Sequence, residues 1–411
     1  MSERAILHSD LNCFFASVER VLNPEYEGKA IAVCGSIEDR HGIVLAKSEL
    51  AKQAGVKTGM VIWQAKQLCP DLITVKPNYE YYSKFSSLVR DIYYRFTDLV
   101  EPFGLDECWL DVTNSHIFGT PYQIAEKIRT TIKRELGLTV SIGVSYNKVF
   151  AKLGSDMKKP DAITEISRQN FRDKIWGLSV SNLLCVGRAT TKRLNEHGIF
   201  TIGELALSPL SVIQKMLGVN GVQLWHYARG EDTSRVMHRD FVFPAKSLGH
   251  GITCNADLEN EEEVWRVILQ LSQDLGHRLR VHNLSASGVK LSVKSDDLKV
   301  RQYQAPLEIQ TQSPFEIATA ARRLFKSYEW DKKVRALSVT AIGLSSESKP
   351  FQIDLFADLE RHDKQKSIDD AVYIIRNKFG DKAVRAASLL GNLKMPDNSE
   401  RNSVLPGKMF E

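Results

Sequence analysis

The sequence predicts a multidomain protein of mixed α and β structure. Its 411 residues are more than one hydrophobic core ordinarily supports, so several domains are expected. Strand-like and helix-like segments follow one another between residues 5 and 146, which favours an α/β or α+β core with one sheet covered by helices. Strands with one apolar and one polar face return between residues 287 and 345. We therefore expect an α+β fold in several domains.

The N-terminal elements are placed by the spacing of apolar residues. Gly55 and Gly137 fit the C-terminal ends of the helices that precede them. In order, the predicted segments are a strand at 5–7, a helix at 14–21, a strand at 29–35, a helix at 45–56, a long helix at 79–100, a hairpin around 103–113, a helix at 121–137 and a strand at 138–146.

The hairpin stretch FGLDECWLDVT places Asp106 and Glu107 between apolar runs. Taken alone, this pair fits a solvated turn, since Asp is a common turn residue. A further carboxylate, Asp10, stands where the first strand gives way to a helix, and the three can converge if the two strands are neighbours. Carboxylates that crowd together in a core need a cation, and Mg²⁺ prefers such oxygen ligands. The spacing is compatible with a metal site, but it does not favour a metal site over a solvated turn.

Residues 183–205, LLCVGRATTKRLNEHGIFTIGEL, have the spacing of a helix–hairpin–helix unit around Val186 and Gly187. The backbone N–H groups of such a hairpin can hold a phosphate without reading a base sequence. The stretch MLGVNGVQLW, residues 216–225, looks like a degenerate second copy. For a single copy, an ordinary pair of helices is an equally good interpretation.

A unit between residues 245 and 345 carries a basic sheet face. Lys290 and Lys294 alternate with apolar residues along one strand, and Arg335 lies on the polar side of another. Helices are predicted at 261–280 and 313–328, so the sheet should be covered on one face and open on the other. The open basic face is either a contact for a polyanion or simply solvated.

The overall charge permits a polyanionic partner. The net charge is +5, and residues 168–240 hold ten Lys or Arg against six Asp or Glu. No apolar run reaches the length of a membrane span, and no secretory signal is visible, so no membrane partner is expected. Six scattered cysteines without a CxxC motif argue against a zinc site or a disulfide framework and suit a reducing, cytoplasmic location.

Three stretches together resemble the signature of Y-family, lesion-bypass DNA polymerases of the polymerase IV type. They are HSDLNCFFASVER, GLDECWLDVT and SIGVSYNKVFAKLGSDMKKPDAIT, and the resemblance covers about residues 1–345. It implies a right-hand polymerase that adds dNTPs to a primer on a DNA template, with low fidelity, in translesion synthesis. The implied domains are a palm at 1–10 and 78–166, fingers at 11–77, a thumb at 167–240, a little finger at 241–345 and a C-terminal tail at 346–411.

The resemblance also implies the roles of single residues. Asp10, Asp106 and Glu107, with the carbonyl of Leu11, would hold two Mg²⁺ ions, and Phe15 would be the steric gate that excludes a ribose 2′-hydroxyl. The dNTP triphosphate would be contacted by backbone N–H groups of Cys13 and Phe14 and by the side chains of Lys52 and Lys159. DNA would be contacted by Val186, Gly187, Lys246, Lys290, Lys294 and Arg335.

Two positions depart from the family pattern. SELAKQAGV places Glu49 and Lys52 where the family usually has Tyr and Arg, which puts the triphosphate contact of Glu49 in doubt. Lys47 or Ser48 is a possible substitute. In the thumb hairpin, Cys185 stands where a glycine is usual.

The pentapeptide QIDLF resembles the bacterial sliding-clamp-binding motif. Gln352, Leu355 and Phe356 would fill a pocket on the clamp, although five residues match easily by chance. A helix with Ile368, Val372, Ile375 and Phe379 in register is expected after it, and residues 394–411 are expected to lack fixed structure. We expect the protein to be a monomer that binds primer–template DNA, dNTPs and the clamp.

Two other functions compete with a DNA polymerase. A catalytically silent DNA-binding subunit on the same fold is disfavoured because all three carboxylates are present. A cyclase-like enzyme with a carboxylate-bearing palm is disfavoured because it would need no grip on a duplex.

Overall fold

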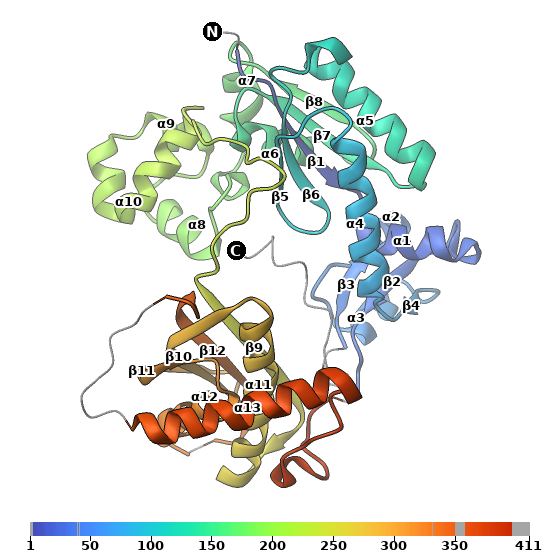
Figure 1. Ribbon diagram of the computed structural model, residues 1–411. Helices are drawn as coiled ribbons and strands as arrows, with labels where there is room; N and C mark the ends of the chain where they lie inside the picture. Colours follow the sequence, from blue (N-terminus) through green and yellow to red (C-terminus); the bar gives the residue numbers. More distant parts are fainter. Residues whose placement is uncertain (1–2, 39, 41, 331, 350–357, 397–411) are drawn as a thin grey trace. The chain divides into compact units, whose positions relative to one another are not determined.

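The computed structural model describes residues 3–38, 40, 42–330, 332–349 and 358–396. Most of them form two compact units, the first built from residues 3–34 and 44–242 and the second from residues 243–396 together with the described residues among 35–43 (Figure 1). Each unit has its own hydrophobic core. In this part of the chain, no helix is both long and apolar enough to cross a membrane.

A five-stranded sheet forms the centre of the first unit. Its strands lie in the order β5 (Val100–Pro102), β6 (Glu107–Asp111), β1 (Ile6–Leu11), β7 (Val140–Ser145) and β8 (Ile163–Ile166). Helices α4 (Tyr79–Tyr93) and α5 (Pro121–Leu136) cover one face, and α6 (Lys148–Met157) covers the other. The hairpin, α5 and β7 confirm the predicted segments, whereas the predicted helix at 79–100 ends at Tyr93 and leads into β5.

Strand alternation decides which side chains of β1 meet α6. Leu7 and Leu11 join the core beneath α4 and α5, whereas Ile6, His8 and Asp10 face α6. Helix α6 lies so close to β7 that a Cβ atom on Gly143 would be 1.9 Å from a backbone oxygen of α6. Only glycine permits this approach, which brings the polar side chains of α6 onto the end of β1.

A smaller three-stranded sheet follows β1 in the chain. It pairs β3 (Val44–Lys47), β2 (Ile31–Cys34) and β4 (Ile73–Val75) and carries α1 (Phe14–Leu22), α2 (Glu49–Gln53) and α3 (Ile62–Leu68). The predicted helix at 45–56 was therefore wrong in its first part. Residues 44–47 are a strand because β2 offers them backbone partners, whereas Ser48 caps the short helix that comes next.

Helices follow β8 in the first unit. They are α7 (Phe171–Ile175), the 3₁₀ turn η3 (Val180–Asn182), α8 (Arg188–Asn195), α9 (Ile202–Leu207) and α10 (Leu210–Ala228). The expected hairpin lies between η3 and α8, so its first helix is a single 3₁₀ turn. Gly218, with a φ of 65°, breaks α10 at the place of the expected second copy.

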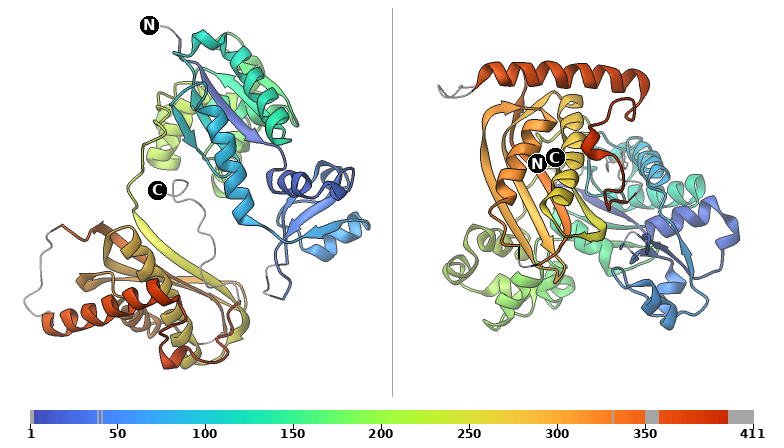
Figure 2. Two further views of the ribbon diagram at one scale, coloured as in Figure 1. Left: turned by 45° about the vertical axis from the view of Figure 1, so that its right-hand side comes forward. Right: turned by 90° about the horizontal axis from the view of Figure 1, so that it is seen from below.

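The second unit is a four-stranded antiparallel sheet with helices on one face. The strands lie in the order β11 (Val300–Thr311), β10 (Leu284–Ser295), β12 (Val334–Ser346) and β9 (Ser247–Leu258). Helices α11 (Glu261–Val281) and α12 (Pro314–Phe325) pack against the apolar face (Figure 2). The one-sided sheet confirms the expectation, although β9 and β11 were not predicted as strands.

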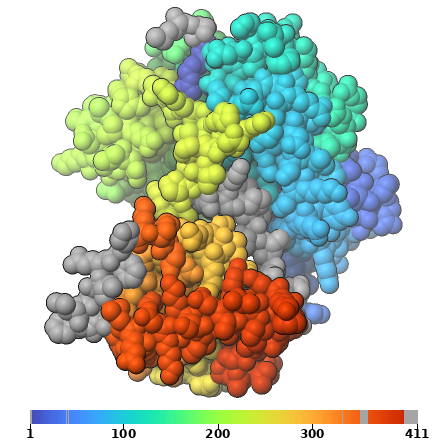
Figure 3. All heavy atoms as spheres, in the orientation of Figure 1, coloured from blue at the N-terminus to red at the C-terminus, as the bar shows by residue number. Residues whose placement is uncertain are grey.

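The C-terminal segment contains the predicted helix and the first residues of the end that is expected to lack fixed structure. Helix α13 (Leu359–Phe379) forms, with Ile368, Ile375 and Phe379 exposed, and it docks on α11 and α12 through polar groups such as Asp369 and Asp370. Of the end at 394–411, only residues 394–396 are described, and there the N–H of Asn255 donates to the carbonyl of Lys394. Leu389 and Met395 are buried in the core of the second unit, which α13 and this segment cover on one side (Figure 3).

Candidate active site

The predicted carboxylates meet at the paired ends of β1 and β6. Asp10 lies directly opposite Glu107 in the antiparallel register, and the backbone N–H of Leu11 donates to the carbonyl of Asp106 at 2.9 Å. Asp106 is the last residue before β6. The condition set by the sequence, that the two strands be neighbours, is confirmed.

Two lysines from one segment of the chain engage these carboxylates. The ammonium of Lys152, on α6, lies 2.7 Å from an oxygen of Glu107 and 3.6 Å from Asp10. The ammonium of Lys159, in the loop after α6, lies 2.7 Å from the same oxygen of Asp10. The site is therefore an alternating set of anions and cations, in which Asp10 is buried, Glu107 and Lys152 are partly buried and Lys159 is exposed. Lys152 was not singled out from the sequence, although the NKVFAK run places it one helical turn after Lys148.

Burial and neighbouring charge set the ionisation of the site. Burial raises the pKa of Asp10 to about 6 in spite of Lys159, and burial together with the charge of Glu107 raises the pKa of Asp106. Burial acts in the same direction on Glu107, but contacts with His8 and Lys152 outweigh it and lower its pKa to about 2.

His8 is a member of the site that sequence reasoning missed. Its ring is fully buried, its Nδ1 lies 2.8 Å from Ser155 Oγ and its Nε2 lies 3.3 Å from Glu107. Burial lowers the pKa of His8 to about 4, so the ring is neutral at pH 7. Its position two residues before Asp10, on the same face of β1, is the signal that could have found it.

The donor set fits Mg²⁺ by its chemistry. Asp10, Asp106 and Glu107 supply hard oxygen donors, and their buried negative charge, which two ammonium groups balance here, is the kind that a divalent cation balances. Within the described residues, no three His, Cys, Asp or Glu side chains are grouped as a metal site requires. To hold an ion, the carboxylates of Asp10 and Glu107 would have to turn from Lys159 and Lys152.

The two phenylalanines at the start of α1 differ in their surroundings. Phe14 is 3% exposed and belongs to the core. Phe15 is only partly buried, and its ring stacks on that of Tyr82, with 4.2 Å between centroids and 10° between planes. The hydroxyl of Tyr82 donates to the buried carboxylate of Glu19 at 2.6 Å. Of the two rings, that of Phe15 is the one partly open to a ligand.

Glu49, which stands where the family usually has Tyr, contacts residues close to it. The Glu49 carboxylate lies 3.2 Å from the ammonium of Lys52, and the thiol of Cys13 contacts it at 3.7 Å. Ser48 is occupied in capping α2, and Lys47 donates to Thr58. Cys13 itself has a left-handed backbone and precedes α1, whose first N–H groups have no partner within the helix.

The predicted DNA contacts lie in two separate places. In the first unit, Gly187 caps α8, whereas the side chain of Val186 is buried and its N–H donates to the carbonyl of Leu183. The N–H of Val186 is therefore not free for a phosphate, contrary to the expectation for this hairpin. Cys185, where a glycine is usual, has a left-handed backbone with a φ of 68°.

In the second unit, the polar sheet face carries the other predicted contacts. Lys290 and Lys294 are partly exposed on β10, Arg335 lies at a bulge of β12 and Lys246 is exposed just before β9. Gln352, Leu355 and Phe356 lie outside the described residues.

Comparison with known proteins agrees with this architecture. Residues 9–156 match the impB/mucB/samB family, residues 181–232 match the thumb domain of DNA polymerase iota, and residues 245–355 match the C-terminal domain of the impB/mucB/samB family. A solved structure, the Y-family DNA polymerase chimera Dbh-Dpo4(243-245)-Dbh, shares the fold with a TM-score of 0.74 and 24% identity. The match covers 83% of this chain and 99% of the chimera.

Curated relatives match over nearly their full length. DNA polymerase IV of Acetivibrio thermocellus is 50% identical over 94% of this chain and 98% of its own. DNA polymerase IV 2 of Bacillus subtilis is 36% identical over 95% of both chains, and DNA polymerase IV 1 of Halalkalibacterium halodurans is 32% identical over 99% and 98%. The chain therefore belongs to the DNA polymerase IV family of Y-family translesion DNA polymerases, which are DNA-directed DNA polymerases that bind primer–template DNA and dNTPs.

Proposed function

We propose that Asp10, Asp106 and Glu107, with the carbonyl of Leu11, hold two Mg²⁺ ions at the catalytic centre of this polymerase. The observation that carries the proposal is the pairing of Asp10 with Glu107 at the end of two neighbouring strands, on the face where Lys152 and Lys159 lie. Magnesium bound there would activate the primer hydroxyl and stabilise charge on the leaving pyrophosphate.

The reaction that this centre serves is an in-line displacement. The primer 3′-oxygen forms a bond to the α-phosphorus of the dNTP while the bond to the pyrophosphate oxygen breaks, and the hydroxyl proton is lost. The chain itself contributes positive charge close to the carboxylates. Lys159 shares Asp10 Oδ2 with Lys152, so a triphosphate entering this site would meet two ammonium groups. We assign Lys159 to the triphosphate contact.

The start of α1 completes the nucleotide site in this proposal. Cys13 is the N-cap of α1 and Phe14 its first residue, so their backbone N–H groups belong to a helix N-terminus, where an anion is favoured. Lys52 supplies a further cation that Glu49 partly neutralises. Phe15 is the steric gate, because its ring is the partly exposed one and is held against Tyr82.

DNA is held by two independent surfaces in this proposal. The N-terminus of α8 at Gly187 takes a backbone phosphate in the first unit, and Lys290, Lys294, Arg335 and Lys246 take phosphates in the second. The tail motif at Gln352, Leu355 and Phe356 recruits a sliding clamp, which would keep the enzyme near a primer end.

Primer extension tests the assignment of the centre. The wild-type enzyme with Mg²⁺ and four dNTPs should extend a primer, and Asp106→Asn should not, although it should bind the same DNA. Extension by the variant at the wild-type rate would reject the carboxylate assignment. A wild-type chain that binds DNA without extending it would favour the silent accessory subunit.

A further inference from the structure

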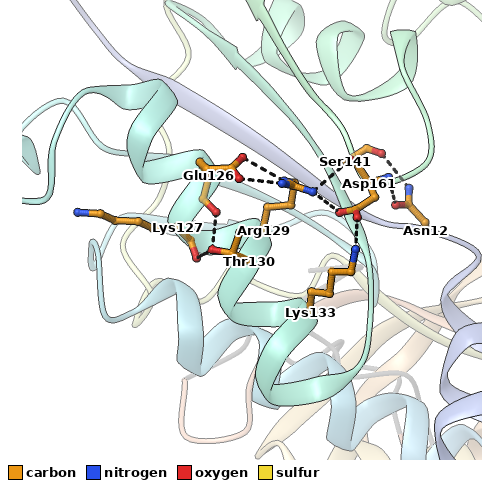
Figure 4. A network of polar contacts seen from close by, with 8 residues as sticks. All are labelled: Asn12, Glu126, Lys127, Arg129, Thr130, Lys133, Ser141 and Asp161. Carbon is orange, nitrogen blue, oxygen red and sulfur yellow. Dashed lines mark hydrogen bonds and ion pairs between the residues drawn. The ribbon is translucent and has the colours of Figure 1, made fainter.

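The loop that carries Lys159 is tied to the strand that carries Asp10. This loop, residues 158–162, joins α6 to β8. The backbone N–H of Asp161 donates to Oδ1 of Asn12 at 2.9 Å, and Asn12 directly follows β1 (Figure 4). One residue, Pro160, therefore lies between Lys159 and the donor of this bond, and one residue, Leu11, lies between Asp10 and the acceptor.

The amide of Asn12 is fixed at both ends. Its Nδ2 donates to the hydroxyl of Ser141 at 2.9 Å, and Ser141 lies directly opposite Asp10 in the pairing of β1 with β7. Asn12 and Ser141 are both buried. A flipped amide would turn its NH₂ group toward the N–H of Asp161, so this orientation is the one that satisfies both partners.

The carboxylate of Asp161 fixes the same loop to α5. Oδ1 lies 2.8 Å from the guanidinium of Arg129, and Oδ2 lies 2.7 Å from the ammonium of Lys133. Arg129 is in turn held by Glu126 through two hydrogen bonds, of 2.7 and 3.1 Å. Burial would raise the pKa of Asp161, but Lys133 and Arg129 lower it, so the carboxylate is charged. The contacts converge on Asp161 from separate elements (Figure 4).

We propose that Asn12 and Asp161 are positioning residues that place the ammonium of Lys159 for its contact with the dNTP triphosphate. The inference rests on the proposed phosphate role of Lys159. A lysine side chain is long and flexible, so its charge is well placed only if its backbone is fixed. Displacement of a substrate-positioning group by about 1 Å can cost up to roughly a hundredfold in rate.

The test uses two variants of Asp161 that avoid a backbone artefact. The residue has a φ of 54°, which Asn and Gly tolerate and Ala does not. Asp161→Asn removes the charge and keeps the shape, and Asp161→Gly removes the carboxylate. We expect KM for the dNTP to rise roughly threefold and tenfold, respectively, with a smaller change in kcat. The Kd of a non-hydrolysable dNTP on a dideoxy-terminated primer should rise in parallel. Asn12→Ala should resemble Asp161→Gly.

A control and a double variant separate positioning from general damage. Glu135, on α5, accepts two hydrogen bonds from Arg95, and neither residue belongs to the loop that carries Lys159. Glu135→Gln removes the charge of this carboxylate and should leave KM unchanged. In a Lys159→Ala background, Asp161→Gly should add no further rise in KM, because both act through the same ammonium.

The outcomes distinguish a failure of the positioning role of Asn12 and Asp161 from a failure of the proposed triphosphate contact of Lys159. If Lys159→Ala leaves KM and Kd unchanged, the triphosphate role of Lys159 is wrong. If Lys159→Ala raises both while the Asp161 and Asn12 variants do not, the role of Lys159 stands and the positioning role is wrong. Additive effects of Lys159→Ala and Asp161→Gly would also overturn the positioning role. Thermal unfolding of each variant identifies any loss of folded protein.

Discussion

The ring of Phe15 lies almost parallel to the ring of Tyr82, with their centroids 4.2 Å apart. Tyr82 is fully buried, and its hydroxyl donates to Glu19, which lies one turn further along the helix that begins at Phe14. Phe15, the proposed steric gate, is thus linked through Tyr82 back to its own helix by a ring stack and a hydrogen bond. To move aside for a larger sugar, the ring of Phe15 would have to give up its stack on Tyr82, which costs free energy.

Replacing Phe15 by Ala should admit ribonucleotides. Removal of the ring opens the space that a 2′-hydroxyl needs, so the ratio of rNTP to dNTP insertion should rise by at least roughly tenfold while dNTP insertion persists. Single-nucleotide insertion kinetics with matched dNTP and rNTP measure this ratio. Phe14→Leu is the control, since it alters a buried neighbour and should lower stability by about 1 kcal/mol without changing sugar choice. An unchanged ratio in Phe15→Ala would mean that Phe15 only packs.

Asp106→Asn should abolish extension but preserve DNA binding. If Asp106 is a metal ligand as proposed, its loss should lower kcat by at least roughly a hundredfold, whereas the proposed DNA contacts lie in other parts of the chain and should be unaffected. Removal of divalent metal with a chelator should have the same effect on the wild-type enzyme. Asp156→Asn, at a carboxylate that pairs with Lys152 and Lys159, should have a much smaller effect. Equal losses in the two variants would point to general electrostatic damage.

DNA binding should weaken steeply with salt. The proposed contacts are to phosphates, so the logarithm of the binding constant should fall linearly with the logarithm of the salt concentration. Fluorescence anisotropy with two unrelated duplexes measures both the slope and the independence of sequence. The Lys290→Ala, Lys294→Ala double variant should have a shallower slope, by about one to two units, on both duplexes. An unaltered slope would show that this sheet face does not contact DNA.

The tail motif should be needed for clamp stimulation only. Replacing Leu355 and Phe356 with Ala should leave extension on short primers intact and remove the increase in product length that a loaded clamp gives on long templates. Product length with and without clamp, for both proteins, is the decisive measurement. If the clamp stimulates both equally, QIDLF is a chance match.

The segment after α13 should stabilise the second unit. Leu389 is 2% exposed and lies in the core of that unit, whereas Leu390 is 60% exposed. Leu389→Ala should therefore cost about 2–4 kcal/mol in the free energy of unfolding, and Leu390→Ala close to none. Urea denaturation of the two variants beside the wild type tests this. Equal stabilities would mean that the segment is not bound in solution.

Local features of the sequence determined the elements that need no distant partner. Helix α5 begins at Pro121 after a Thr120 capping box and ends at Gly137, whose φ is 66°, and these residues specify both ends within a few positions. The alternation of apolar and basic residues along β10 determines which face of the strand is buried and which is basic, whatever strands pair with it. The motifs that resemble the family are also local, and they are enough to predict Asp10, Asp106 and Glu107 as metal ligands, Phe15 as the steric gate and Lys159 as a phosphate contact.

The tertiary structure decided what depends on residues far apart in the chain. Residues 44–47 have the spacing of a helix, yet form β3 because β2 pairs with them. Ile375 and Phe379 are in helical register, yet remain exposed because polar contacts dock α13. Leu389 is buried because the chain returns to a core formed mainly by residues 248–341 and contacts α11, which ends more than a hundred residues earlier.

In the candidate active site too, the tertiary structure decides which residues meet. Asp10 and Glu107 are 97 positions apart, and only the register of β1 with β6 sets one opposite the other. His8 and Lys152 enter the site because strand alternation and the close approach of α6 at Gly143 turn them toward these carboxylates. Propensity and capping act over about one helical turn, so a sequence encodes them locally, whereas the charge environment of a buried group is summed over every element packed against it.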